Sequence, residues 1–280
     1  MLSTRDHNRF QEGFRYVYPV VSRRAGGVSL GINLNTNNAC NWRCIYCQVP
    51  GLVRGAPPAV DVESLQRELS VFLGKILNGS YLQDCVPEGQ RRLNDIAFSG
   101  NGEPTSAPNF VEAVDAVHYV RTQTNVPEWV KTVLITNGSL IHQKKVIRGV
   151  EKLGDINGEV WFKIDRVTPE GIRSINDTSG NKSRMVSNLE SASRACPTWI
   201  QTCLFKVDGM DPSSAELDAY VDLIRELQTR DIPFKGILLY GLARQSFQPE
   251  SSRLTPVGNV WFESFAQRLR ELGVAVKLSI

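Results

Sequence analysis

Short apolar stretches alternate with longer amphipathic stretches along most of the chain. The apolar stretches are mostly rich in β-branched or aromatic residues, which is typical of buried β-strands. The predicted strands are Val28–Asn35, Asp95–Ser99, Val130–Thr136, Glu159–Asp165, Thr198–Phe205, Phe234–Tyr240 and Val274–Ile280.

The stretches between these strands have apolar residues at helical spacing. One predicted helix follows a possible cap at Asp61, and a second is expected to begin at Asp211-Pro212, with a cap and a first-turn proline. The apolar stripes of these helices are Val62, Leu65, Leu69, Phe72 and Ile76, and Leu217, Tyr220, Val221, Ile224 and Leu227. Further helices are expected near residues 108–123, 140–153, 183–195 and 257–272.

Alternation of strands and helices predicts an α/β fold with a parallel sheet and right-handed crossovers. The number of repeats fits a partial or nearly closed barrel better than two domains. We therefore predict an N-terminal extension over residues 1–27 and a single barrel domain over residues 28–280. In such barrels the chemistry lies at the C-terminal ends of the strands.

Composition narrows the class of protein. A chain of 280 residues that is 41% hydrophobic and 22% charged is long enough to bury a sizeable core. The polar start is not a signal peptide, and the longest apolar run, 236–243, is too short to cross a bilayer. We expect a cytoplasmic monomer that does not enter the membrane.

The net charge of +3 is too small to predict a nucleic-acid partner by itself. The N-terminal segment is locally more basic, which indicates either a solvated or packed extension or a substrate-binding patch. Its arginines are Arg5, Arg9, Arg15, Arg23 and Arg24.

Three of the six cysteines form a tight cluster directly after the first predicted strand. Cys40, Cys44 and Cys47 have the spacing CxxxCxxC, with Tyr46 before the last cysteine. Such a cluster indicates metal binding in a reducing compartment. The remaining cysteines are expected to be buried free thiols, with an auxiliary cluster or a reactive thiol as alternatives. These are Cys85, Cys196 and Cys203.

The type of metal follows from the number of ligands. Structural zinc takes four protein ligands, but no histidine, aspartate or glutamate lies near the triplet. Three cysteines on a [4Fe–4S] cube leave one iron open to a cofactor, whereas a ferredoxin site would supply a fourth cysteine. Arg43 and Arg54 add positive charge near an anionic cluster, and Gly51 and Gly55 let the loop wrap closely. An iron–sulfur site is favoured over zinc and over structural thiols.

The cysteine motif, with its aromatic residue and its place after the first strand, resembles the radical S-adenosylmethionine (SAM) superfamily. The resemblance implies a partial (β/α)6 TIM-like barrel, with the open iron of the cluster bound by SAM. It also implies an enzyme that cleaves SAM reductively to a 5′-deoxyadenosyl radical, which abstracts hydrogen from a substrate. Tyr46 would then lie near the adenine.

Later strand ends carry further candidate residues. Ser99 to Thr105 is similar to the glycine-rich motif of this family, with Asn101 between Gly100 and Gly102, and Glu103 would contact the SAM amino group. The turn at Thr136 and Asn137 is expected beside SAM, although a plain strand-to-helix turn explains it equally well. The remaining candidates are polar residues at two other strand ends.

Strand alternation places Trp161, Lys163 and Asp165 on one face. Lys163 and Asp165 either pair with each other or contact the SAM ribose or the substrate. Arg244 is expected to bind an anion of the substrate or SAM, or to form a structural salt bridge. Lys163, Asp165 and Arg244 are also the candidate catalytic residues.

The later motifs resemble an iron–sulfur oxidoreductase subgroup related to the tRNA wyosine-synthesis enzymes. That resemblance suggests an RNA base as the substrate and tRNA or another RNA as the partner. No cysteine precedes Cys40 and no flavodoxin-like domain is attached, so an external donor of the flavodoxin or ferredoxin type is expected. The alternatives are a radical SAM enzyme acting on a peptide or small metabolite, and a non-catalytic iron–sulfur protein.

Overall fold

The computed structural model describes residues 13–22, 26–242 and 244–279 of the chain. Its main feature is an eight-stranded sheet that curls into a half-barrel, with the strand order β1-β2-β5-β6-β7-β8-β10-β12. The strands of this sheet are β1 Val17–Ser22, β2 Gly27–Ile32, β5 Leu93–Phe98, β6 Lys131–Thr136, β7 Gly158–Lys163, β8 Thr198–Cys203, β10 Ile237–Tyr240 and β12 Val276–Ser279.

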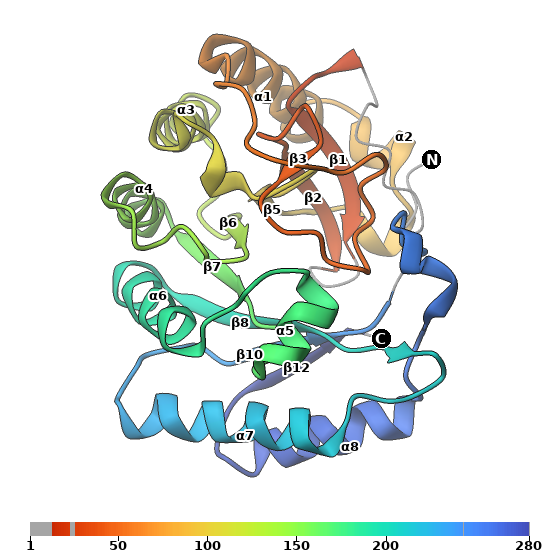
Figure 1. Ribbon diagram of the computed structural model, residues 1–280. Coiled ribbons are helices and arrows are strands. Elements are labelled where there is room, and N and C mark those ends of the chain that lie inside the picture. The colour runs from red at the N-terminus through yellow and green to blue at the C-terminus, as the bar shows by residue number, and fades with distance from the viewer. Residues whose placement is uncertain (1–12, 23–25, 243, 280) are drawn as a thin grey trace.

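Helices connect the strands and cover the outer side of the sheet (Figure 1). The helices are α1 Val62–Leu77, α2 Tyr81–Cys85, α3 Phe110–Gln123, α4 Lys144–Asp155, α6 Lys182–Ala195, α7 Ser214–Thr229 and α8 Asn259–Arg270. Helix α5, Pro169–Asn176, instead lies beside the cysteine loop, where the Ile45 N–H donates to the carbonyl of Ile175. Two short strand pairs complete the elements that the site uses, β3 Ala39–Cys40 with β4 Val53–Arg54, and β9 Lys206–Val207 with β11 Leu254–Thr255.

Because side chains alternate between the two faces of each strand, the outer face of the sheet is apolar and its concave face carries polar residues. On β5, Ile96 and Phe98 belong to the main apolar core, whereas Asp95 and Ala97, with Ser99 directly after the strand, line a pocket on the concave side. Burial of the outward-facing residues against the helices supplies the main hydrophobic stabilisation. The concave side is therefore the surface that is left for a ligand.

The predicted fold class is confirmed. Each of the seven predicted strands is present in the main sheet, and successive strands from β2 onward pair in parallel. The sheet contains one more strand, β1, which pairs antiparallel with β2 and was assigned to the N-terminal extension. Glu68 of α1 anchors the start of β1, because its carboxylate accepts from the backbone N–H groups of Arg15, Tyr16 and Val17.

The helix predictions hold, apart from one start. The carboxylate of Asp61 caps α1 by accepting from the Ser64 N–H at 3.0 Å. The prediction that a helix begins at Asp211-Pro212 is wrong. Helix α7 begins at Ser214, and its cap is Ser213, whose hydroxyl accepts from the Glu216 N–H. No helix among the described residues is long and apolar enough to span a bilayer.

Candidate functional site

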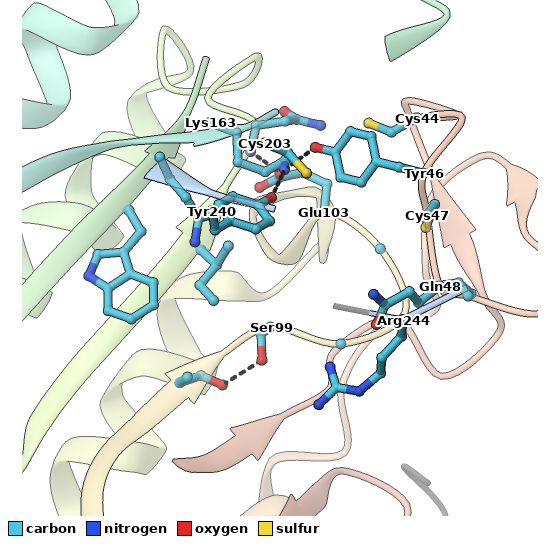
Figure 2. A pocket seen from close by; sticks show the side chains of 18 of the residues that line it. Cys44, Tyr46, Cys47, Gln48, Ser99, Glu103, Lys163, Cys203, Tyr240 and Arg244 are labelled. Carbon is cyan, nitrogen blue, oxygen red and sulfur yellow. Dashed lines mark hydrogen bonds between the residues drawn. The ribbon is translucent and has the colours of Figure 1, made fainter. Parts of the chain in front are cut away.

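A cavity of about 280 Å³ opens on the concave side of the sheet, at the end where the parallel strands terminate. All three clustered cysteines line it. In Figure 2, Cys44, Tyr46 and Cys47 lie on one side of the pocket, and Lys163, Cys203 and Tyr240 come from the strands that face them. The chemistry predicted from separate motifs therefore shares one pocket.

The cysteine loop packs against the glycine-rich turn that follows β5. A Cβ atom on Gly102 would lie only 2.1 Å from the carbonyl oxygen of Ala39. At Gly100, where φ is +128°, a Cβ would lie 2.6 Å from Oδ1 of Asn33. The two glycines thus allow a close approach between loops of the chain itself, which sets the turn directly beside Cys40.

A second segment, residues 246–250, fastens the cysteine loop from the other side. We call it the strap. The hydroxyl of Ser246 donates to the carbonyl oxygens of Ile45 and Cys47 at 2.7 and 3.1 Å. The Phe247 N–H donates to the Cys47 carbonyl at 2.9 Å. The strap is therefore bonded to the backbone of the cysteine loop.

Arg43 and Arg54 are paired with acidic side chains. Arg43 donates to Asp177 at 2.8 Å and to both carboxylate oxygens of Glu250 at 2.9 Å, and Arg54 contacts Asp177 at 2.9 Å. We call this group the arginine clamp. Hydrogen bonds from Arg43 lower the pKa of both Asp177 and Glu250, so that the clamp stays charged at neutral pH. The positive charges of Arg43 and Arg54 were expected to face a cluster. They are balanced by the carboxylates of Asp177, directly after α5, and of Glu250 in the strap.

Burial controls the state of the cysteine thiols. It raises the pKa of Cys40 to about 11 and that of Cys44 to about 12, so that both are neutral thiols in the metal-free chain. Metal binding must therefore displace their protons. Backbone N–H groups of Trp42 and Glu103 at Cys40, and the amide of Asn176 at Cys44, favour the anionic form of sulfur.

The geometry differs from that of a single-ion site. Within the described ranges, no three His, Cys, Asp or Glu side chains converge on a position that one metal ion would occupy. A zinc ion needs its ligands about 2.0–2.3 Å from one centre. Cysteines around a [4Fe–4S] cube bind different irons and do not need to converge in this way.

Tyr46 is held in a buried network on the strand side of the loop. Its hydroxyl donates to Oδ2 of Asp165 at 2.5 Å, and Asn176 donates to the same oxygen at 2.8 Å. The Asn176 amide also donates to the sulfur of Cys44 at 3.3 Å. Burial raises the pKa of Tyr46 well above its usual value, so the phenol remains a donor.

Lys163 joins this network from β7. Its ammonium group donates to the hydroxyls of Tyr46 and Tyr240 and lies 3.7 Å from Asp165. Burial by itself lowers the pKa of Lys163, but the Asp165 carboxylate and the other ionisable neighbours raise it well above the usual value. The ion pair that was one of the two interpretations of Lys163 and Asp165 is therefore present, and Lys163 also lines the pocket.

Glu103 is almost fully buried and ties β5 to β6. Its Oε1 accepts from Thr105 and from the Thr136 hydroxyl at 2.7 Å, and its Oε2 accepts from the Asn137 N–H at 2.6 Å. Burial raises the pKa of Glu103, and these hydrogen bonds oppose that shift. The carboxylate has a fixed position at the pocket wall.

The structure brings most, but not all, of the predicted site residues to the cavity. Asn101 turns to Asn38 of the cysteine loop, while Thr136 and Asp165 are buried behind the lining residues. Those that line the cavity are Cys40, Cys44, Tyr46, Cys47, Gly100, Gly102, Glu103, Asn137, Lys163 and Arg244. Four of the N-terminal arginines, Arg5, Arg9, Arg23 and Arg24, lie outside the described residues.

Sequence reasoning did not single out Asn176, Tyr240 or the strap. They meet the cysteine loop only through the fold. The other cysteines are free thiols. Cys196 and Cys203 are buried as predicted, but Cys85 at the end of α2 is only partly buried, so that prediction is wrong for Cys85.

Comparison with known proteins identifies the family. The family model "Radical SAM superfamily" matches residues 34–217, which include the cysteine triplet, Glu103 and Lys163. The chain belongs to the radical SAM superfamily. Membership implies a [4Fe–4S] cluster and SAM as cofactors.

Solved structures support the same fold for this radical SAM chain. SuiB of Streptococcus suis, crystallised with SAM, has a TM-score of 0.57 and 12% identity over 91% of this chain and 47% of its own. A radical SAM methyltransferase from Sphaerobacter thermophilus has a TM-score of 0.59 and 12% identity, covering 90% of this chain and 66% of its own. At these identities the likeness concerns the fold alone.

A curated relative is more similar in sequence. A UPF0026 protein of Helicobacter pylori is 23% identical over 221 residues, which cover 78% of the radical SAM chain and 65% of the relative. The chain thus matches less than two thirds of the length of that relative.

Proposed function

We propose that the chain is a radical SAM enzyme with a single [4Fe–4S] cluster on Cys40, Cys44 and Cys47. The observation that carries the proposal is the opening of all three cysteines onto one cavity, beside the braced carboxylate of Glu103. When bound, the cluster would supply the electron that cleaves SAM to methionine and a 5′-deoxyadenosyl radical. The radical would then abstract hydrogen from a substrate.

The donor set fits such a cluster. Three thiols are supplied by one loop, and N–H groups point at the sulfurs of Cys40 and Cys44. Hydrogen bonds to sulfur stabilise the negative charge of an iron–sulfur cluster. The strap and the arginine clamp hold this loop in one conformation, so little ordering is left for the moment of metal binding.

The pocket residues supply positions for SAM. Oε2 of Glu103 accepts a hydrogen bond from the Asn137 N–H and has lone-pair capacity left for the SAM amino group. Lys163 and Tyr240 present polar groups from the facing strands. Tyr46 and Asn137 complete the polar wall. These residues would bind and orient SAM, and they would exclude water from the radical.

We propose an external electron donor of the flavodoxin or ferredoxin type and, from the sequence resemblance, an RNA base as the substrate. The cluster and the cleavage of SAM are tested by anaerobic reconstitution with iron and sulfide, followed by addition of dithionite and SAM. We expect about four irons per chain, on the stoichiometry of one cube, and production of 5′-deoxyadenosine. A chain that takes up zinc only, or iron without yielding 5′-deoxyadenosine, contradicts it.

A further inference from the structure

Gln201 is a buried amide that has no hydrogen-bond partner among the residues that the structure describes. It lies within β8, its side chain is 1% exposed, and neither its Oε1 nor its Nε2 is within hydrogen-bonding distance of another group. Native proteins rarely leave a buried side-chain amide unpaired, because the amide loses water without gaining a replacement. Gln201 also lines the cavity described above. A ligand in that cavity is therefore the partner that the amide lacks.

The residues that pair with Gln201 in the sheet do not bond its amide. Gln201 pairs in register with Lys163 of β7 and with Leu238 of β10. The ammonium group of Lys163 is directed to the hydroxyls of Tyr46 and Tyr240, and Leu238 has no polar side-chain atom. No neighbour in the same layer of the half-barrel therefore satisfies the amide.

Gln201 is separated from Glu103 and Asn137, two of the proposed SAM contacts. These two residues follow β5 and β6, whereas Gln201 belongs to β8, with β7 in between. It stands two residues before the end of its strand, deeper in the sheet than the cysteine loop. The substrate is therefore a better partner for Gln201 than SAM.

The walls beside Gln201 define the shape of the ligand. Trp161 of the neighbouring strand β7 lines the same cavity and is half-buried, and Ile135 of β6 and Ala97 of β5 add apolar surface farther along the cavity wall. A carboxamide offers one donor and one acceptor side by side in one plane. Its best complement is a planar group that has an N–H and a C=O on adjacent atoms.

We propose that Gln201 binds the substrate, and that the substrate carries a planar lactam edge of the kind found in uracil and guanine. This inference rests on the proposed function only in taking the cavity as the substrate pocket. The lactam can belong to a free nucleoside or to an exposed base of an RNA, because both present the same edge.

The test measures binding to the reconstituted protein with its cluster and SAM. Binding of uridine and guanosine is measured by the change in tryptophan fluorescence and by equilibrium dialysis. N3-methyluridine and N1-methylguanosine, which lack the N–H of the lactam, are measured in the same way. RNA from cells without the protein serves as a third ligand. We expect one of the unmodified nucleosides or the RNA to bind, and N-methylation to weaken nucleoside binding about tenfold or more.

Variants assign the effect to Gln201. We expect Gln201→Leu to weaken binding of the unmodified ligand about tenfold or more and to remove the preference over the methylated one. Thr132→Val is the matched control, because the Thr132 hydroxyl is also buried without a partner but does not line the cavity. It should leave the ligand affinity unchanged. RNA binding without nucleoside binding would assign the lactam to an RNA base.

Three results would overturn the inference. The first is no binding of any nucleoside or RNA by protein that still produces 5′-deoxyadenosine, which leaves the proposed function intact. The second is equal binding by Gln201→Leu and the unaltered protein. The third is a loss of SAM affinity in Gln201→Leu, which would assign the amide to the adenine of SAM. A protein that forms no cluster contradicts the proposed function instead.

Discussion

The cysteine loop and the inner face of the sheet beneath it differ in how far their polar groups are hydrogen-bonded by the protein itself. The loop is fixed by the chain itself, since Ser246 and Gln248 of the strap bond the backbone of the loop and Arg43 is held by two carboxylates. On the inner face, the amide of Gln201 has neither of its polar atoms bonded. The same pocket therefore has one preorganised wall and one incomplete wall.

This difference separates two tasks. A cluster-binding loop must keep three sulfurs in position before the metal arrives, and rigid support lowers the cost of ordering them. A substrate pocket gains specificity from polar groups that only the correct ligand satisfies. Substitutions in the first region should change the cluster, and substitutions in the second should change ligand choice.

The largest expected effect is that of Cys44→Ala. Removal of this thiol should reduce bound iron after reconstitution to less than about one tenth and abolish 5′-deoxyadenosine, because a cube held by two cysteines has lost a ligand. Iron and sulfide analysis, together with the visible absorption of the reconstituted protein, measures this loss. Cys196→Ala is the control, since Cys196 is a buried free thiol outside the pocket. Equal iron loss in both variants would contradict the assignment.

The next effect is expected from Arg43→Gln, which breaks the arginine clamp. Loss of charged hydrogen bonds to Asp177 and Glu250 should destabilise the metal-free protein by about 1–2 kcal/mol. This is less than the loss expected for a buried ion pair, because solvent screens these partly exposed groups. Urea unfolding at pH 7 measures it. Arg253→Gln, which breaks an exposed pair with Asp208, should have less effect.

The clamp also predicts a dependence on pH. Hydrogen bonds from Arg43 lower the pKa of Asp177 and Glu250 in the folded chain. The contribution of these two carboxylates to folding stability is therefore fully present above the pKa values of the unfolded carboxyls. It is lost as the pH falls through the lower pKa values of the folded state. The stability difference between Arg43→Gln and the unaltered protein should shrink in acid. A difference that stays constant would contradict the clamp.

A smaller effect is expected at Asn176, which bonds the sulfur of Cys44. Hydrogen bonds to sulfur favour the reduced cluster, so Asn176→Leu should make its reduction potential more negative. A bond worth about 1 kcal/mol corresponds to about 40 mV for one electron. Spectroelectrochemical titration of the loaded protein measures the shift.

The control for this shift is Asn188→Leu. Asn188 is also a buried asparagine, but its amide donates to the carbonyl of Gly138 and not to a cysteine. Its substitution should lower stability and leave the potential unchanged. The same potential shift in both variants would show that general loosening, not the bond to sulfur, is responsible.

The sheet and the cysteine triplet were accessible from sequence because both are local patterns. The β-branched runs and the CxxxCxxC spacing each lie within a few residues. Strand β1 was missed as a strand of the barrel, although its position at the sheet edge suits Pro19, which cannot donate to a ladder. Helix α5 was also missed, and it has only eight residues.

The contacts around the cysteines were less accessible because they join distant parts of the chain. Asn176 bonds a sulfur 132 positions away, and Ser246 bonds a carbonyl 201 positions away. A single polar residue at such a distance has no spacing signal. The incomplete bonding of Gln201 is likewise visible only when its neighbours are known.

The smallest expected effect tests the one misplaced helix start. Asp211-Pro212 has the residue types of a cap and a first-turn proline, but Ser213 accepts the bond from Glu216. The carboxylate of Glu216 is used elsewhere, because it accepts from the Val167 N–H and the Thr168 hydroxyl next to β7. This tether draws the first turn of α7 toward the sheet, which makes Ser213 the last residue outside the helix.

Ser213→Ala should therefore cost about 1 kcal/mol of folding free energy, the usual loss for a removed cap. Asp211→Ala should cost less, since it removes only a partly exposed ion pair with Lys206 at 3.5 Å. Thermal or urea unfolding of the metal-free protein measures both. Because α7 packs on the outer side of the sheet, neither variant should alter iron content or ligand choice. If Asp211→Ala were the more damaging, the sequence-based start would be correct and the tether through Glu216 would not define the helix.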